Sequence, residues 1–206
     1  MNDTDNINLT DNFRSLKNIE LEDNNIIVCN RDIKPLQKAV KTLTELGIQI
    51  RIEGSIQQIL KQLTEEFKAV NADCKAILND IEVLLSQFKL VSKVDYFKLI
   101  LSTVNSNMCS KFHKDNNTLR LLCTYAGPGT LWLPKTAVKS VKNPNEVNWE
   151  DEFSNEIQQA QTGEVVLLKG MLYPNGNAVM HKSPSIEEAG NKRLLLRIDT
   201  YDFLNF

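Results

Sequence analysis

Residues 118–125 read TLRLLCTY, a strand-like run that decides the fold class. Successive side chains of a strand point to opposite faces of its sheet. The two faces of this run are Arg120, Leu122 and Thr124 on one side and Leu121, Cys123 and Tyr125 on the other. Three other runs are strand-like: YFKLILSTV at 96–104, EVVLLK at 164–169 and RLLLRID at 193–199. Turns such as AGPGT and PNGN separate them, and several short strands at close spacing favour a sandwich or a small barrel.

The part of the chain before these strands is mainly helical. Apolar residues recur at helical spacing in the ranges 34–46, 55–70 and 73–91, which we predict to be helices. Short strands are predicted at 25–29 (NIIVC) and at 48–52, where isoleucine alternates with polar residues. We expect the helices to pack on the outside of the barrel, with four leucines facing it: Leu60, Leu63, Leu84 and Leu85.

The chain divides into a short tail and one domain. Residues 1–20 are rich in Asn and Asp, show no sustained periodicity and are predicted to be a flexible tail. Residues 21–206 then form a single α+β domain, with a mainly helical part at 21–92 and a β-barrel core at 93–206. A chain of this length can bury a core without disulfides or a structural metal.

Composition excludes several classes of protein. The formal net charge is −2 and the pI is near 5.8, and no basic stripe marks a nucleic-acid partner. The apolar runs are too short to cross a bilayer, and the N-terminus has no secretion signal, so we expect a cytoplasmic protein without membrane contact. The four cysteines contain no C-x-x-C pair and are expected to be reduced thiols.

A metal site is predicted from the two histidines of the chain and one aspartate. In the segment FHKDN, His113 and Asp115 are two positions apart, and in an extended chain such residues project to the same side. His181 is the second histidine and supplies a third ligand. Two histidines and one carboxylate leave coordination positions open, as in ferrous oxygenases, whereas a structural zinc site closes its shell with four protein ligands. The alternative is a pair of surface histidines with ordinary hydrogen bonds.

Two arginines follow His181 on the last predicted strand. Arg193 lies twelve positions past His181 (193 − 181), and Arg197 lies four further along and faces the same side. Either guanidinium could hold the distal carboxylate of a dicarboxylic co-substrate, or be a solvated charge at a strand edge. Arg120, Tyr125 and Trp132 are candidates for lining the cavity, although core packing is the simpler role for the two aromatic residues.

These residues carry a resemblance to a known family. The run LRLLCTYAGPGTLWLP (119–134), with FHKD before it and GEVVLLKG (163–170), HKSPSI (181–186) and KRLLLRID (192–199) after it, resembles the bacterial family called domain of unknown function 1826. Its motif order in turn resembles the double-stranded β-helix dioxygenases that use iron and 2-oxoglutarate. That similarity implies a cupin-like jelly-roll barrel, metal ligation by His113, Asp115 and His181, and co-substrate binding by Arg193. The gap between His181 and Arg193 is slightly longer than in those enzymes, which bears on 2-oxoglutarate and not on the metal.

The sequence therefore predicts an Fe(II)- and 2-oxoglutarate-dependent dioxygenase acting on a small molecule or protein that it does not identify. The alternative is a non-enzymatic metal-binding or small-molecule-binding cupin-like protein, for instance a metal-handling accessory protein. A third possibility is a barrel without chemistry that acts as an interaction scaffold, with the helices as its docking face.

Overall fold

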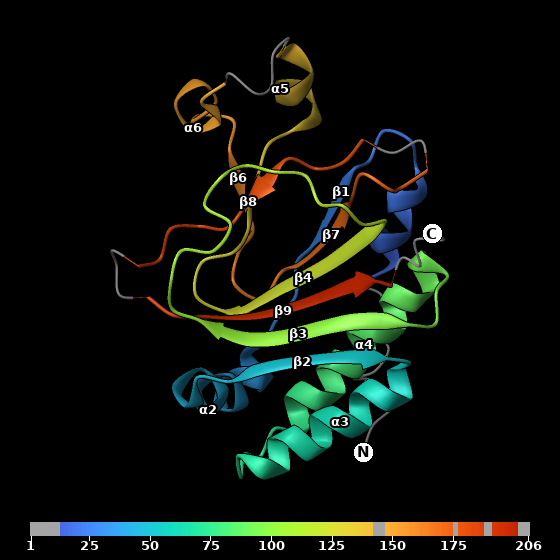
Figure 1. The fold of residues 1–206 in the computed structure, drawn as a ribbon, viewed down its shortest axis with the longest axis vertical. Coiled ribbons are helices and arrows are strands. Elements are labelled where there is room, and N and C mark those ends of the chain that lie inside the picture. The colour runs from blue at the N-terminus through green and yellow to red at the C-terminus, as the bar shows by residue number, and fades with distance from the viewer. Residues whose placement is uncertain (1–12, 142–146, 175–176, 188–190, 202–206) are drawn as a thin grey trace.

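A computed structural model of the chain describes residues 13–141, 147–174, 177–187 and 191–201 (Figure 1). Its helices are η1 (Arg14–Glu20), η2 (Lys34–Leu36), α2 (Gln37–Leu46), α3 (Ile56–Ala69), α4 (Lys75–Ser92), α5 (Lys135–Ser140) and α6 (Trp149–Glu152). Its strands are β1 (Ile26–Cys29), β2 (Gln49–Gly54), β3 (Phe97–Val104), β4 (Leu119–Ala126), β5 (Leu131–Trp132), β6 (Gln158–Gln159), β7 (Val165–Lys169), β8 (His181–Lys182) and β9 (Arg193–Thr200). In the part of the chain described, no helix has both the length and the apolar character to span a bilayer.

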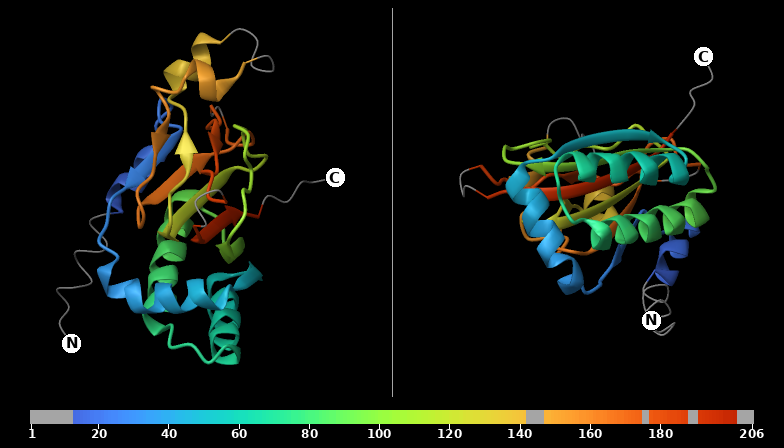
Figure 2. Two further views of the ribbon diagram at one scale, coloured as in Figure 1. Left: turned by 90° about the vertical axis from the view of Figure 1, so that its left-hand side faces the viewer. Right: turned by 90° about the horizontal axis from the view of Figure 1, so that it is seen from below.

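The strands form two antiparallel sheets. The larger has six strands in the order β1-β7-β4-β9-β3-β2, and the smaller has three in the order β6-β5-β8. Figure 2 shows the smaller sheet, with α5 and α6, at the opposite end of the molecule from α2 and α3. The predicted α+β class is confirmed. Among the described residues no strand pairing joins the two sheets, so a closed barrel is not shown.

One face of the larger sheet packs against the helices. The residues that β4 and β9 turn to this face are Leu121, Cys123, Tyr125, Leu194, Leu196 and Ile198. Leu63, Leu84 and Leu85 of α3 and α4 are fully buried, and Leu60 is partly buried against the same core. The prediction that these four leucines face the strands is confirmed. Ser55 caps the N-terminus of helix α3, and its hydroxyl accepts from the Gln58 amide in a capping box.

The other face of the larger sheet packs against the smaller sheet. This second core joins Leu122, Val166 and Leu168 of the larger sheet with Ala160 and Val179, and Trp132 and Leu195 lie against it. Leu122 and Leu195 belong to the face of β4 and β9 that also carries Arg120 and Arg197, because side chains alternate along a strand. The space between the sheets is therefore where polar side chains of β4 and β9 can meet residues of β8.

The prediction of a flexible tail at 1–20 is wrong for its last residues. Residues Arg14–Glu20 form the 3-10 helix η1. Phe13, Leu16 and Ile19 are buried against the main core, at 1% exposure or less. These apolar residues are three apart, which is the period of a 3-10 helix and not of an α-helix. The helical and strand periods alone therefore miss this element, and residues 1–12 lie outside the described part.

Candidate metal centre

Backbone pairing brings together two histidines that are far apart in the sequence. His113 lies between β3 and β4, and His181 begins β8. The amide of each donates to the carbonyl of the other at 2.9 Å, the pattern of a hydrogen-bonded antiparallel pair. Side chains of directly opposite residues lie on the same face, and the two ring centroids are 4.6 Å apart. Main-chain contacts therefore set the positions of both rings.

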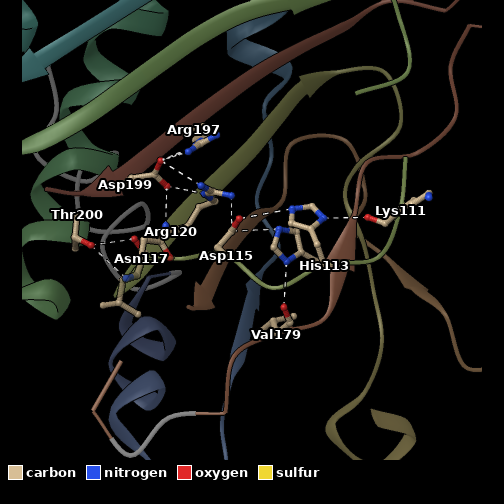
Figure 3. Close-up of polar contacts among 11 residues, drawn as sticks. Lys111, His113, Asp115, Asn117, Arg120, Val179, Arg197, Asp199 and Thr200 are labelled. Carbon is tan, nitrogen blue, oxygen red and sulfur yellow. Dashed lines mark hydrogen bonds and ion pairs between the residues drawn. The ribbon is translucent and has the colours of Figure 1, made fainter. Parts of the chain in front are cut away.

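Asp115 completes the group of three side chains (Figure 3). Its Oδ1 lies 3.6 Å from Nε2 of His113, and its Oδ2 lies 3.2 Å from Nε2 of His181. One ligand atom from each residue lies within 4.8 Å of the other two. The carbonyl of Asp115 also accepts from the Met171 amide at 2.9 Å, which fixes the main chain beside the site. The structure thus brings together the three residues predicted as ligands.

The other ring nitrogens are held by backbone carbonyls. Nδ1 of His113 lies 3.0 Å from the carbonyl oxygen of Lys111, and Nδ1 of His181 lies 3.2 Å from that of Val179, as Figure 3 shows. Since a carbonyl only accepts, each Nδ1 must carry the proton in these hydrogen bonds. In the neutral imidazole, Nε2 is then unprotonated, and its lone pair is available to a metal at the site. Histidine ligands of metals are commonly held in this way.

Two arginines and a second aspartate form a network behind Asp115. Arg120 of β4 makes ion pairs with Asp115 and, at 2.6 Å from Nε to Oδ1, with Asp199 of β9. Arg197 donates from Nε to Oδ2 of the same Asp199 at 2.6 Å. Asp199 thus holds two guanidinium groups, and one of them orients Asp115 (Figure 3). Asp115 Oδ2 is buried between Arg120, with which it is ion-paired, and His181, although neither contact has the geometry of a hydrogen bond.

The electrostatic surroundings keep Asp115 ionised. Burial by itself would raise the pKa of this carboxyl group, but the neighbouring His113 and His181, when they are protonated, and the charge of Arg120 outweigh it and hold the pKa far below its usual range. The nearby carboxylate of Asp115 raises the pKa of His113 against the opposing effect of burial, because it stabilises the protonated imidazole. At neutral pH the site therefore presents a carboxylate to any cation that enters it.

A cavity of about 470 Å³ opens beside this group. Both histidines line it, together with Arg120 and Arg197 from the larger sheet. The region next to the two Nε2 atoms is therefore open to a small molecule. A larger cavity of about 610 Å³ lies elsewhere, around residues such as Lys169 and Tyr173, and its lining includes none of the predicted site residues.

The two candidate arginines of β9 have different surroundings. Arg197 lines the cavity and is paired with Asp199. Arg193 is 1% exposed, its Nη2 donates to Thr124 Oγ1 at 3.2 Å, and its Nε has no hydrogen-bond partner among the described residues. Burial lowers the pKa of Arg193 to about 10. Gly127 makes room for this side chain, because a Cβ there would lie 2.9 Å from Arg193 Cγ.

Other residues considered from the sequence are also placed. Tyr125 faces the helices, where its hydroxyl donates to Asp80 at 2.6 Å, and Trp132 packs between the sheets, so core packing describes both. Arg120 lines the cavity as expected. Asp199 and Thr124 were not predicted as site residues. Strand alternation could have found both, since Asp199 is two positions from Arg197 and Thr124 is two from Leu122.

One cysteine, Cys109, is exposed at the edge of this cavity. Cys29, Cys74 and Cys123 are buried, and burial raises the pKa of Cys74 and of Cys123 to about 11. We expect Ellman's reagent to modify one thiol per folded chain rapidly, because only an accessible thiolate reacts. The Cys109→Ser variant should lose this fast phase. Fast reaction of a second thiol in the folded protein would contradict the burial of the other three.

Comparison with known proteins places this site in a family. Residues 10–199 match the family described as Protein of unknown function (DUF1826). The chain belongs to this family. The resemblance seen in the sequence is thereby confirmed, and the matched range of DUF1826 includes all three candidate ligands. A comparison with curated proteins found no match.

Solved structures similar to this DUF1826 protein include two dioxygenases for auxin oxidation and one prolyl-4-hydroxylase. A dioxygenase for auxin oxidation from rice is 10% identical, with a TM-score of 0.48 over 91% of this chain and 76% of that one. Dioxygenase for auxin oxidation 1 from Arabidopsis thaliana, in complex with 2-oxoglutarate, is 9% identical, with a TM-score of 0.43 over 93% and 74%. A prolyl-4-hydroxylase from Pseudomonas putida is 11% identical, with a TM-score of 0.35 over 79% and 96%.

Proposed function

We propose that this protein is an Fe(II)- and 2-oxoglutarate-dependent dioxygenase whose substrate is not yet identified. The observation that carries the proposal is the convergence of His113, Asp115 and His181 beside a cavity. Two unprotonated imidazole nitrogens and one carboxylate on the same side of a cation leave positions open for other ligands, which suits ferrous iron. A structural zinc site would need a fourth protein ligand, and no fourth His, Cys, Asp or Glu joins the group in the described residues.

The residues fit a divalent cation by the chemistry of their donor atoms. Asp115 is a buried carboxylate whose Oδ2 is ion-paired with Arg120 and lies 3.2 Å from Nε2 of His181, so imidazole nitrogens and a charged oxygen, which divalent transition metals bind, meet at one point. His113, Asp115 and His181 would hold the metal, while Arg120 holds the carboxylate in place and Lys111 and Val179 fix the ring orientations. When bound, iron and 2-oxoglutarate supply the oxidising chemistry directed at a substrate C–H bond.

Arg193 is the better candidate for the distal carboxylate of 2-oxoglutarate. It is a buried guanidinium whose Nε lacks a partner in the described residues, whereas Arg197 already binds Asp199. Burying such a cation is costly unless an anion meets it. Leu122 and Leu195 line the cavity. Thr124 lies two positions after Leu122 on the same face of β4, and Arg193 lies two positions before Leu195 on the same face of β9. Arg193, which bonds to Thr124, therefore lies just beyond the cavity wall.

We also propose that the two sheets correspond to those of a double-stranded β-helix. The support is the arrangement itself: a six-stranded and a three-stranded antiparallel sheet share a core, and the candidate ligands lie between them. Sites in such barrels are built on strands facing the interior, which gives ligand side chains fixed directions. In this scheme α2, α3 and α4 cover the outer face of the larger sheet.

The experiment is a titration of the Fe(II)-loaded protein with 2-oxoglutarate without oxygen, followed by visible absorption. We expect a new absorption band, because 2-oxoglutarate binds the metal directly in enzymes of this class. In Arg193→Met the 2-oxoglutarate affinity should fall about a hundredfold or more, since truncating one partner of a buried charge pair costs roughly 2–5 kcal/mol. Iron affinity should stay unchanged, because Arg193 is not among the candidate ligands.

Arg197→Met is the matched control for this titration. It removes a guanidinium from the same strand face but leaves Arg193 and Thr124 in place. A large loss in Arg197→Met with none in Arg193→Met would transfer the co-substrate role to Arg197. Iron binding without any response to 2-oxoglutarate would favour the second candidate, a non-enzymatic metal-binding protein. That candidate is supported by the position of Arg193, whose side chain does not itself line the cavity.

A further inference from the structure

The cavity beside the candidate ligands is lined by positive charge. Its charged lining residues, apart from the two histidines, are Arg51, Arg120, Lys182 and Arg197. No Asp or Glu of the described residues lines it. The catalytic scheme proposed above uses Arg120 to hold Asp115 and does not use Arg51. A cavity with one sign of charge concentrates ligands of the opposite sign.

Strand register places two of these arginines on either side of an apolar residue. Arg51 of β2 is paired with Ile100 of β3, and Ile100 is paired with Arg197 of β9. Directly paired residues point to the same face of the sheet. Neighbouring strands are about 4.8 Å apart, so the Cα atoms of the two arginines are separated by roughly 10 Å. Two long side chains at this separation can both reach an acid group placed above Ile100.

The carboxylates near the cavity do not neutralise all of its arginines. Asp199 binds both Arg120 and Arg197, and Asp115 binds Arg120 and is a candidate metal ligand. Lys182 is paired with Glu150. Arg51 is exposed and has no ion pair with any described residue. Three arginines thus share two carboxylates, and a divalent metal would add further positive charge.

The floor of the same cavity is apolar. Ile100, Leu122 and Leu195 line it from β3, β4 and β9. Leu122 is directly paired with Arg197, so Ile100, Arg197 and Leu122 lie side by side across β3, β9 and β4. A ligand that fits these surroundings has an acid group at one end and an apolar body at the other, since guanidinium groups bind carboxylate and phosphate through paired hydrogen bonds.

We propose that the substrate is a small organic anion whose carboxylate or phosphate binds Arg51 and Arg197 while its apolar part lies on Ile100 and Leu122. This inference rests on the proposed function, which places the atoms that react next to His113 and His181. The acid group then serves to orient the apolar part toward the metal ligands. Loss of either arginine removes a charge-assisted hydrogen bond from this orientation.

The test measures binding of three simple probes to the full chain by isothermal titration calorimetry: benzoate, phenyl phosphate and the neutral benzamide. Each is titrated into the metal-free and the Zn(II)-loaded protein, so that binding by the arginines is separated from direct metal coordination. We expect at least one anion to bind about tenfold or more tightly than benzamide in both forms, as expected for charge-assisted hydrogen bonds. The stronger of the two anions identifies the acid group as carboxylate or phosphate.

Variants assign the binding to its residues. Arg51→Gln should weaken the preferred anion about tenfold or more, Arg51→Lys should weaken it less because the charge remains, and benzamide should be unaffected. Lys61→Gln on the exposed side of α3 is the matched control and should change nothing. Arg51 is exposed on an edge strand, so these variants should fold, and circular dichroism checks this.

The outcomes separate this inference from the proposed function. If zinc and iron fail to bind but an anion still binds through Arg51, the dioxygenase fails and the anion site stands. If iron and 2-oxoglutarate bind but the anions bind no better than benzamide, the anion inference is overturned. It is overturned as well if anion binding is lost in Arg193→Met and kept in Arg51→Gln, because the probe then occupies the co-substrate position.

Discussion

The His181→Ala protein is expected to lose tight Fe(II) binding and to keep its fold. One of three candidate ligands disappears, and the effect should exceed the roughly 10–100-fold loss seen when a residue that only orients a ligand is removed. The fold should persist because His181 is joined to His113 through main-chain hydrogen bonds, which alanine can also make. Iron affinity is measured without oxygen by competition with a chelator, and the melting temperature is measured on the same samples.

Lys114→Ala is the control for this result. Lys114 lies between His113 and Asp115 in the sequence, but its side chain is exposed and belongs neither to the group of candidate ligands nor to the lining of the cavity. Its replacement should leave iron affinity unchanged. If His181→Ala binds iron as tightly as the natural protein while Asp115→Ala does not, the metal site does not include His181. The proposed metal site of two histidines and one carboxylate would then be wrong.

The six strands of the larger sheet were predictable because their signal is local. The strands of the smaller sheet, β5, β6 and β8, were not predicted, because two residues each are too few to show a period. The run TLRLLCTY forms β4, and its two alternating faces separate as expected: Leu121, Cys123 and Tyr125 toward the helices, and Arg120, Leu122 and Thr124 toward the smaller sheet. The pattern does not say which face carries the site, since both contain a leucine and a polar group. That depends on which elements cover each face. The element η1 was missed because its period of three is typical of neither an α-helix nor a strand.

The sequence could predict which residues are the candidate ligands, but not how they are arranged in space. His113 and Asp115 share a side because they are two apart, which is local. Their meeting with His181 depends on a bridge between a loop and β8, which no local pattern encodes. The same limit applies to the arginines of β9. Arg193 and Arg197 share a face, as alternation predicts, yet one bonds to Thr124 and the other to Asp199 because of how β9 pairs with β4.

Of all the substitutions proposed for this protein, Asp80→Ala is expected to cause the largest loss in the free energy of unfolding. Asp80 of α4 accepts three hydrogen bonds in the core between the helices and the sheet. Two come from Arg31, one from Nη1 and one from Nη2 at 3.0 Å, and the third comes from the Tyr125 hydroxyl at 2.6 Å. The side chains of Arg31 and Asp80 are 2% and 8% exposed. Removing the aspartate leaves a buried guanidinium without its counter-charge, which costs about 3–5 kcal/mol of the free energy of unfolding. Urea unfolding followed by circular dichroism measures it.

The surface pair of Lys89 and Asp95 provides the control for this prediction. Its side chains are 51% and 81% exposed, so Asp95→Ala should cost less than about 1 kcal/mol. The double replacement Arg31→Met with Asp80→Leu should recover much of the stability lost in Asp80→Ala, because two apolar side chains leave no buried charge unpaired. If Asp80→Ala costs no more than Asp95→Ala, Arg31 must find another partner or water. The ion pair would then not hold α4 to the sheet.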